Sequence, residues 1–349
     1  FLAIYSSNLD EFYRVRVASH RNLLRLNKST QAKYDINPRI LIRKINQTVD
    51  KQQAELGEIF REQLQPEFEK NGVFILNESE ISESHRSYVR DYFKKNVLKH
   101  ISLLRISTNQ APPFLENKRL YFVVSLESEF SDDTGDQEHV IINIPTHVLP
   151  RFVPLPVEGK KHEIMFLDDV IRVSSDLLFP NRKIVSLYSI KLSRDADLHL
   201  EDEFSEDIVE KIKSSLKKRS TGVPSRFLYD LNMPKELLLF LKRVFFLQKE
   251  DLVPGGKYHN FSDFFAFPCP DNRKFFFDEF LELPHKKYQK YKSVFKGIAE
   301  SDFIFHFPYQ SYDNAIRFIE EASNDRKVKS IKITLYRVAD TSRINKALI

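Results

Sequence analysis

Residues 328–337, with the sequence VKSIKITLYR, alternate apolar and polar side chains. Isoleucines and a leucine alternate with lysine, threonine and tyrosine, which is the period of a strand with one buried face. A second strand-like run at residues 302–309 precedes it, and a helical pattern at residues 312–322 lies between the two. Strand, helix and strand in this order predict a parallel-sheet unit.

Arg337 stands where the second of these predicted strands ends. Ligands of open α/β sheets bind beyond the carboxyl ends of the strands, and a guanidinium is a forked, permanently charged donor that suits phosphate. Arg337 is therefore a candidate phosphate contact. On the pattern alone, an ordinary surface arginine that closes a strand is the more common case.

Asn8 is followed by residues typical of the start of a helix. Asp10 and Glu11 follow, and the combination predicts the start of a helix, because the Asn side chain accepts a backbone N–H and Glu11 can reach back. A short polar side chain at a helix start needs no ligand to explain it. From the residues alone, a capping role for Asn8 is therefore the favoured interpretation.

Two further helices are expected in the first hundred residues. One begins at Asn37, with Pro38 in its first turn, and ends at the pair Asn71-Gly72. Another covers residues 80–99. Residues 1–107 are therefore predicted to form a helical domain.

The middle of the chain changes to a mixture of strand and helix patterns after a linker, TNQAPP, at residues 108–113. Strands are expected at residues 119–126, 139–144, 184–192 and 225–231, and helices at residues 205–219 and 235–246. A phenylalanine-dense stretch at residues 264–277 is expected to pack in a core or between domains. We predict an α+β domain over residues 108–284, followed by the start of an α/β unit.

Composition excludes several functional classes. The chain has 54 Lys and Arg against 49 Asp and Glu, and its net charge of +5 permits a polyanionic partner without requiring one. Its 8 glycines form no Walker-type phosphate loop, and its single cysteine excludes an internal disulfide or a cysteine metal cluster. No apolar run reaches the ~18 residues of a membrane span. We expect a protein of the reducing cytoplasm.

The ten histidines give no clear catalytic group. They lack the helical spacing of zinc ligands. His285 begins an H-x-K string in a charged linker, where coincidence is the simpler account. His259, in GGKYHNF, could donate to a phosphate beside Lys257, although a histidine in such a loop more often fixes a turn. His306 lies between two phenylalanines and is expected to pack on an apolar strand.

The residues alone do not predict a reaction. They form no Ser-His-Asp set and no recognisable carboxylate pair, and the basic residues lack the aromatic interleaving of nucleic-acid motifs, so no nucleic-acid partner is expected. Phe1 is not an initiator methionine, and Ile349 lies inside a helical pattern. These two ends predict a fragment of a longer protein. The positive net charge predicts a mild preference for anionic partners.

Five strings, in order along the chain, resemble the type 1 polyphosphate kinases of bacteria. They are FLAIYSSNLDEFYRVRVA at residues 1–18, SLKKRSTGVPSRFLYD at 215–230, VPGGKYHNFSDF at 253–264, FHFPYQSYDNAIRFIEEAS at 305–323 and IKITLYRVADTSRI at 331–344. The resemblance implies a multidomain α and α+β protein: an N-terminal helical domain (1–107), an α+β head domain (108–284) and the beginning of a phospholipase-D-like α/β catalytic domain (285–349).

The resemblance also implies an activity, the reversible transfer of the terminal phosphate of ATP to polyphosphate through a phosphohistidine, with Mg²⁺ as cofactor. Such chemistry depends mainly on positioning and charge neutralisation. The family's two essential histidines stand in H-x-K and H-x-R contexts that these 349 residues do not contain at matching places. We therefore expect the phosphohistidine beyond residue 349, and these residues alone to be inactive.

Two residues are carried over from the family motifs. Asn8 matches the asparagine of SSNLDEF, which implies a contact with the base side of ATP, and a helix start can serve both roles. Arg337 matches the arginine of the IYRVA motif, which implies an arginine contact, not a metal ligand, in the Mg²⁺–phosphate region. Leu335 departs mildly from the isoleucine of that motif.

The expected partners are ATP or ADP, inorganic polyphosphate, and further copies of the chain in a homodimer or homotetramer formed through the N-terminal and head domains. The expected location is the cytoplasm, including the periphery of the inner membrane. Two alternatives stay open. One is a phospholipase-D-like phosphodiesterase, and the other is a non-catalytic polyanion-binding or assembly module, whose affinity would fall steeply with salt.

Overall fold

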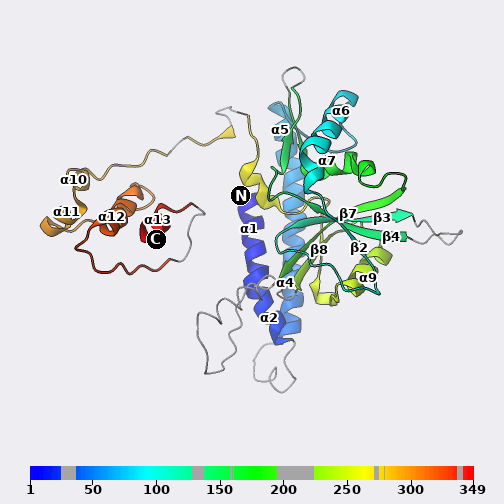
Figure 1. Cartoon of the computed structure of the whole chain (residues 1–349), viewed down its shortest axis with the longest axis horizontal. Helices are drawn as coiled ribbons and strands as arrows, with labels where there is room; N and C mark the ends of the chain where they lie inside the picture. The colour runs from blue at the N-terminus through cyan, green and yellow to red at the C-terminus, as the bar shows by residue number, and fades with distance from the viewer. Residues whose placement is uncertain are drawn as a thin grey trace. The chain divides into compact units, whose positions relative to one another are not determined.

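The computed structural model describes residues 1–24, 37–127, 137–157, 159, 161–194, 224–270, 275–278, 280–335 and 341–349. The chain divides into two compact units, Phe1–Pro270 and Asp271–Ile349, each described here by itself. Some segments are purely helical, and others combine helices with mixed sheets, as expected for a multidomain α and α+β protein (Figure 1). Within the described ranges, no helix combines the length and the apolar character needed to cross a bilayer.

The first unit holds both sheets. Its strands are β1 (Val73–Leu76), β2 (Leu103–Ile106), β3 (Leu120–Glu127), β4 (Gln137–Ile144), β5 (Phe152–Pro154), β6 (His162–Phe166), β7 (Ile184–Arg194), β8 (Pro224–Asp230) and β9 (Leu252–Gly255). Its helices are α1 (Leu2–Phe12), η1 (Tyr13–Val17), α2 (Ala18–Leu23), α4 (Pro38–Glu58), η2 (Ile59–Leu64), α5 (Gln65–Lys70), α6 (Glu83–Tyr92), η3 (Phe93–Val97), η4 (Leu98–His100), α7 (Leu167–Val173), η5 (Ser175–Leu177), α9 (Lys235–Val244), η6 (Lys249–Asp251) and η7 (Phe261–Ala266).

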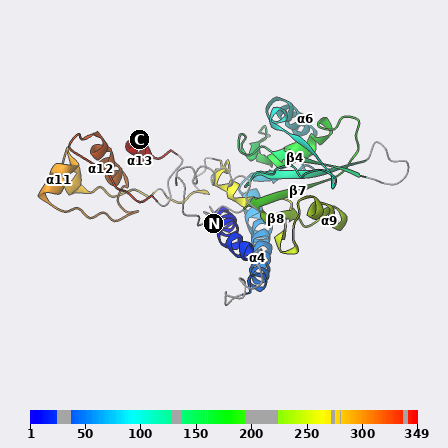
Figure 2. The same ribbon diagram turned by 60° about the horizontal axis from the view of Figure 1, so that its bottom comes forward.

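The larger sheet runs in the order β2-β4-β3-β7-β8-β9, and only its β8–β9 pair is parallel. Side chains of β3 alternate between the two faces. Phe122 and Val124 join a core with α6, η3 and α7, whereas Tyr121 and Val123 join a core with α9. Figure 2 shows α6 and α9 on opposite sides of this sheet. Helices therefore cover both faces.

The strand predictions for the middle of the chain are confirmed for β3, β4, β7 and β8, and the helix prediction is confirmed for α9. The predicted helix at residues 205–219 lies outside the described residues. The short strands β1, β5 and β6, which form a second sheet in the order β1-β6-β5, were not predicted. Three to five residues are too few to establish a period in the sequence.

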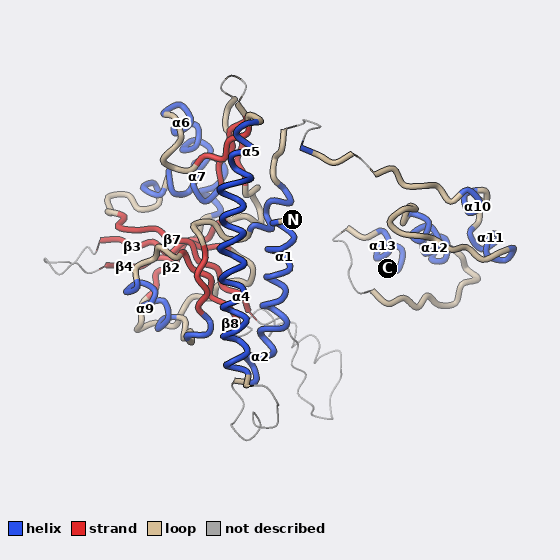
Figure 3. The backbone as a smooth tube through the Cα atoms, turned by 180° about the vertical axis from the view of Figure 1, so that it is seen from behind, coloured by secondary structure: helices blue, strands red, loops and turns tan. Residues whose placement is uncertain are grey.

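The N-terminal helices form an antiparallel pair beside the larger sheet (Figure 3). The hydroxyl of Tyr5 on α1 donates to Gln52 on α4 at 3.0 Å, and the hydroxyl of Tyr13 donates to Asn46 at 2.8 Å. Later residues of the first helix thus contact earlier residues of α4, as expected for antiparallel helices. Tyr13 is also buried in a small core with Leu228 of β8, so that the pair packs on the β8–β9 edge.

The predicted start of the second helix is confirmed, and that of the first is wrong. The side chain of Asn37 accepts the backbone N–H groups of Arg39 and Ile40 at the start of α4. The first helix begins at Leu2, and Asn8 lies inside it, where it caps nothing. Burial of Ala3 against the rest of the unit extends the helix toward the chain start, and this packing overrides the local capping pattern.

The second unit contains α10 (Lys286–Gln289), α11 (Val294–Glu300), α12 (Asp313–Asn324) and α13 (Arg343–Leu348). The predicted helix at residues 312–322 is therefore confirmed, but the flanking strands are not formed. Residues 302–309 and 328–335 carry no ladder, and Ile333 and Leu335 are more than two-fifths exposed. A strand needs a neighbour for its backbone groups, and the described residues of this unit form only an isolated bridge between Leu283 and Gln310.

The predicted domain limits, 1–107, 108–284 and 285–349, stay a prediction. The helical description of the first segment is incomplete, because β1 and β2 lie within it and β2 pairs with β4 of the larger sheet. Phe264 and Phe267 pack against Phe152, as expected for the phenylalanine-dense stretch. Phe277, at the other end of that stretch, is 96% exposed.

Candidate functional site

Asn8 lies on the exposed side of α1, where it borders a groove between α1 and α4. The groove has a volume of about 480 Å³. It is lined by Tyr5, Asn8, Leu9, Phe12, Lys44, Ile45, Thr48, Val49 and Gln52. Apolar walls with a few polar groups at the edge can hold a flat, partly apolar ligand and fix its orientation.

A larger cavity, of about 720 Å³, lies on the other side of α1, between this helix, α4 and the β8–β9 edge of the sheet. Lys191 of β7, Arg226 of β8 and the loop after β9 contribute to its lining. Lys191 and Arg226 are 1% and 2% exposed, so that both cations lie at the floor of the cavity. Burial of this kind requires charge partners.

Asp10 on α1 supplies the carboxylate for both buried cations. The ammonium of Lys191 donates to one oxygen of Asp10, and Nη1 of Arg226 lies 3.5 Å from the other. Burial lowers the pKa of Lys191, and the charge of Asp10 offsets part of this effect. Burial likewise lowers the pKa of Arg226, whose guanidinium stacks 4.5 Å from the Tyr13 ring. Asp10 therefore ties α1 to two strands at once.

The contacts continue from Lys191 across the unit through alternating donors and acceptors. Lys191 donates to the side-chain oxygen of Asn260 at 2.7 Å, and the amide of Asn260 donates to Asp263 at 2.8 Å. Arg151 then donates to Asp263 at 2.5 Å and to both oxygens of Asp168 at 2.6 and 2.9 Å. A continuous chain of polar contacts thus runs from α1 to α7.

All three guanidinium nitrogens of Arg151 donate to carboxylates. Burial disfavours its charge, but the carboxylates of Asp168 and Asp263 outweigh that effect and raise its pKa. Arg151 also donates to the backbone carbonyl of His259 at 3.1 Å. The loop after β9 is therefore held to the rest of the unit by its backbone and by the side chains of Asn260 and Asp263.

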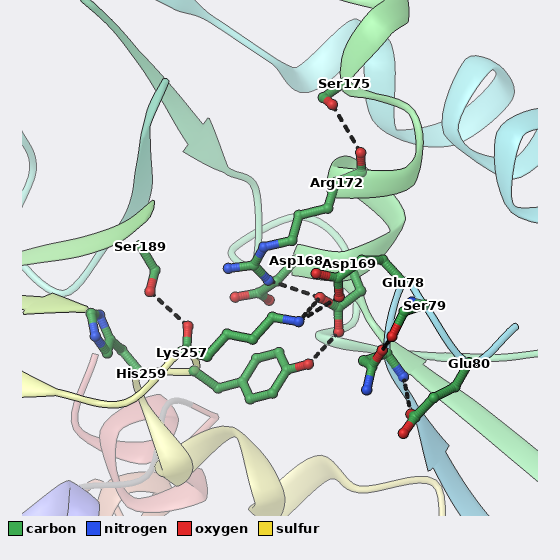
Figure 4. A network of polar contacts seen from close by, with 12 residues as sticks. Glu78, Ser79, Glu80, Asp168, Asp169, Arg172, Ser175, Ser189, Lys257 and His259 are labelled. Carbon is green, nitrogen blue, oxygen red and sulfur yellow. Dashed lines mark hydrogen bonds and ion pairs between the residues drawn. The ribbon is translucent and has the colours of Figure 1, made fainter. Parts of the chain in front are cut away.

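A second polar network surrounds Asp169 on α7 (Figure 4). Asp169 accepts from the Tyr258 hydroxyl at 2.7 Å and from Arg172 at 2.8 Å, and it lies 3.5 Å from the ammonium of Lys257. Lys257 also pairs with Glu78. Burial raises the pKa of Asp169 to about 7, although the charges of Arg172 and Lys257 oppose the shift. Asp169 is thus a buried carboxyl that titrates near neutrality.

The histidines are placed differently from one another. His259 is 4% exposed, and burial together with the nearby cations lowers its pKa well below the usual value. His285 caps α10, where its Nδ1 accepts from the backbone N–H of Tyr288 at 3.1 Å. His306 is exposed and belongs to no strand, so the prediction of a packed strand residue is wrong.

Only one of the two predicted site residues lies among the described residues. Asn8 borders the smaller groove, whereas Arg337 lies outside the described residues. The sequence analysis missed Asp10, Lys191 and Arg226. Their signal is faint, since a lysine that alternates with apolar residues in a strand normally predicts a solvent-exposed face.

Models of a single protein family match most of the chain. The model for the polyphosphate kinase N-terminal domain matches residues 1–76, that for the polyphosphate kinase middle domain residues 84–267, and that for polyphosphate kinase C-terminal domain 1 residues 293–349.

Curated and solved relatives agree with this match. The chain is 32% identical over its full length to a polyphosphate kinase of Yersinia pestis and 33% identical to that of Escherichia coli K12, and it covers 51% of each. The crystal structure of polyphosphate kinase from Porphyromonas gingivalis superposes with a TM-score of 0.77 and is 30% identical, over 99% of this chain and 48% of that one. The chain thus spans about half the length of these relatives.

Proposed function

The chain belongs to the polyphosphate kinase family, and we propose from this membership that the protein transfers the terminal phosphate of ATP, reversibly, to a growing polyphosphate chain. The observation that carries the proposal is the match of three successive family domains, in order, from residue 1 to residue 349. ATP or ADP and inorganic polyphosphate are the partners that this reaction requires.

Asn8 is the proposed contact for the base side of the nucleotide. Its amide offers a donor and an acceptor, and it stands on the exposed side of α1 at the edge of the groove with Leu9, Phe12 and Ile45. A nucleobase needs an apolar surface for its rings and a few polar groups for its edge. The groove supplies both kinds of surface, which supports the proposal.

Arg337 is the proposed contact for the phosphates near Mg²⁺, on the strength of its sequence motif alone. Among the described residues, no group of three or more His, Cys, Asp and Glu side chains is placed to hold a metal ion. Mg²⁺ is usually held by one or two carboxylates together with the phosphates of the substrate, and no step of the reaction is assigned to the ion here.

The phosphohistidine is proposed to lie outside these 349 residues. His259 is buried and held neutral, and the ring nitrogen of His285 accepts from the backbone of its own helix. A nucleophile must reach the terminal phosphate, and neither residue is presented for that. We also propose a cytoplasmic or peripherally membrane-associated enzyme that forms a homodimer or homotetramer through its N-terminal and head domains.

The proposal is tested by labelling with ATP that carries radioactive phosphorus in the terminal position. The full-length protein and residues 1–349 are each incubated with it, Mg²⁺ and a polyphosphate primer. We expect acid-labile label on the full-length protein, lost on addition of ADP, and none on residues 1–349.

Two other results would change the assignment. Label on residues 1–349 would identify a histidine within them as the nucleophile, and His259→Ala and His306→Ala would then locate it. Label on neither protein, with polyphosphate binding that weakens steeply with salt, would replace the kinase by a polyanion-binding module.

A further inference from the structure

Asn8 and Asp10 stand on opposite sides of the same helical turn. Residues two positions apart in an α-helix are separated by about 200° around the axis and about 3 Å along it. Asn8 accordingly faces the groove with α4 and is exposed, whereas the Asp10 side chain is 17% exposed and faces the sheet. Any rotation that moves one of these side chains also moves the other.

Two sets of polar contacts hold α1 in place, in addition to the apolar packing of Leu9 on the core with Leu228 and Val253. The first runs to α4 through the hydroxyls of Tyr5 and Tyr13, which bond Gln52 and Asn46. The second is the pairing of Asp10 with the buried cations of β7 and β8. The contacts to α4 lie on one side of α1. Asp10, together with the apolar packing of Leu9 on Leu228 and Val253, fixes the side that faces the sheet.

The cations that hold Asp10 are themselves fixed. Lys191 is anchored by Asn260 at 2.7 Å, and Nη2 of Arg226 donates to Gln53 on α4 at 3.1 Å. Because both cations are almost fully buried, removal of the shared carboxylate leaves two like charges close together with little exposure to solvent. The repulsion between the two charges and the favourable hydration of each would displace α1, which covers them.

We infer that Asp10 is a positioning residue for the nucleotide: by fixing the rotation of α1 on the sheet, it sets where Asn8 stands in the groove between α1 and α4. The inference rests on the proposed nucleotide contact of Asn8. It assigns to Asp10 a role that is separate from contact with ATP, because the two side chains point to opposite sides of the helix.

A small rotation is enough to matter. A side-chain atom about 6 Å from the helix axis moves by ~2 Å when the helix turns by about 20°. A contact at the base end of the nucleotide is made equally in the ground state and the transition state. Its loss should therefore raise KM and leave kcat almost unchanged.

The experiment measures polyphosphate synthesis by the full-length enzyme and compares Asp10→Asn with the unchanged protein. We expect KM for ATP to rise about tenfold and kcat to change less than twofold. The matched control is Asp176→Asn, which removes a carboxylate from the surface pair with Arg90, 2.7 Å apart, away from α1. We expect this control to leave KM unchanged.

A double-mutant cycle with Asn8→Ala separates positioning from general destabilisation. If Asp10 acts through Asn8, Asp10→Asn adds no further rise in KM once Asn8 is alanine. A purely structural role would lower the melting temperature and would raise KM to the same extent in both backgrounds. Should Asp10→Asn fail to fold, Asn260→Ala loosens Lys191 and leaves the ion pair with Asp10 in place. We then expect a smaller rise in KM, which again disappears with Asn8→Ala.

The outcomes distinguish this inference from the proposed function. An unchanged KM in Asp10→Asn, together with a raised KM in Asn8→Ala, would overturn the positioning role and leave the nucleotide contact of Asn8 intact. Additive effects of the two substitutions would also overturn it. An unchanged KM in Asn8→Ala would remove the contact on which the inference rests, and absence of synthesis by the unchanged enzyme would overturn the proposed function itself.

Discussion

Asp169 shows how burial can dominate the chemistry of one side chain. It is 0% exposed and faces Arg172, Lys257, Glu78 and Tyr258. The two cations favour its charged form, yet the loss of hydration is larger, and its pKa rises to about 7. An ordinary aspartate in an unfolded chain has a pKa near 3.9. The folded protein therefore holds a proton that the unfolded chain releases.

This difference predicts a pH-dependent contribution to stability. Because the folded pKa is the higher one, the contribution is fully present below about pH 4 and is lost as pH rises through about 7, with a slope of up to ~1.4 kcal/mol per pH unit. Asp169→Asn cannot titrate. Denaturant unfolding between pH 4 and 8 should show the stability of the unchanged protein falling relative to Asp169→Asn. Parallel curves for the two proteins would contradict the assigned pKa.

At the scale of the element, two asparagines with similar local sequence signals have different roles. Asn37 precedes a proline and caps α4, where its side chain accepts two backbone N–H groups at 3.0 and 3.4 Å. Asn8 precedes acidic residues but lies inside α1. The first capping pattern is enforced by proline, which cannot continue a helix backward. The second has no such barrier, and packing extends the helix past it.

Alanine substitution should distinguish the two positions. Asn37→Ala leaves two N–H groups of α4 without their acceptor and should lower the free energy of unfolding by about 1 kcal/mol. Asn8→Ala, at an exposed position inside a helix, should leave it unchanged or raise it by a few tenths of a kcal/mol. Urea unfolding of both variants is the measurement. A loss of ~1 kcal/mol in Asn8→Ala would mean that Asn8 does cap a helix in solution.

The second unit shows where an alternating pattern is insufficient. Residues 328–335 alternate as a strand should, but they pair with no neighbour among the described residues, and their apolar side chains remain partly exposed. The pattern establishes which residues could share a face. Whether a ladder forms depends on a partner elsewhere in the structure.

At the scale of the first unit, Arg151 joins segments that are far apart in the sequence. It bonds Asp168 at the start of α7, and Asp263 and the His259 carbonyl in the loop after β9. Its guanidinium also lies 5.4 Å from the Phe166 ring. Asp168 and Asp263, which are distant in the sequence, thus share one guanidinium.

Replacement of Arg151 by Met should therefore be strongly destabilising. It leaves the buried carboxylate of Asp168 and the partly exposed carboxylate of Asp263 without this cation, and we expect a loss of ~3–5 kcal/mol in the free energy of unfolding. Arg90→Met is the control, because Arg90 pairs with Asp176 at the surface, where such a pair contributes about 0–1 kcal/mol. Similar losses for both substitutions in denaturant unfolding would show that Arg151 contributes no more than a surface pair.

The sequence by itself determined the elements whose signal is local. The cap at Asn37 with the proline that follows it, the Gly72 turn with its positive φ, and the alternating apolar runs of β3, β4, β7 and β8 all depend on residues close together in the chain. The family motifs are equally local. These features indicate the α and α+β class, but they place Asn8 at the start of the first helix, whereas it lies inside α1.

Only the tertiary structure decided which side of α1 faces the sheet and what holds it there. In the run of residues 189–193, SIKLS, the alternation predicts that Lys191 faces water. The β8 strand places Arg226 near Lys191 on the same face of the sheet, and α1 covers both. The carboxylate of Asp10 therefore becomes their shared partner. Pairings across 181 and 216 residues depend on long-range packing and cannot be read from a local pattern.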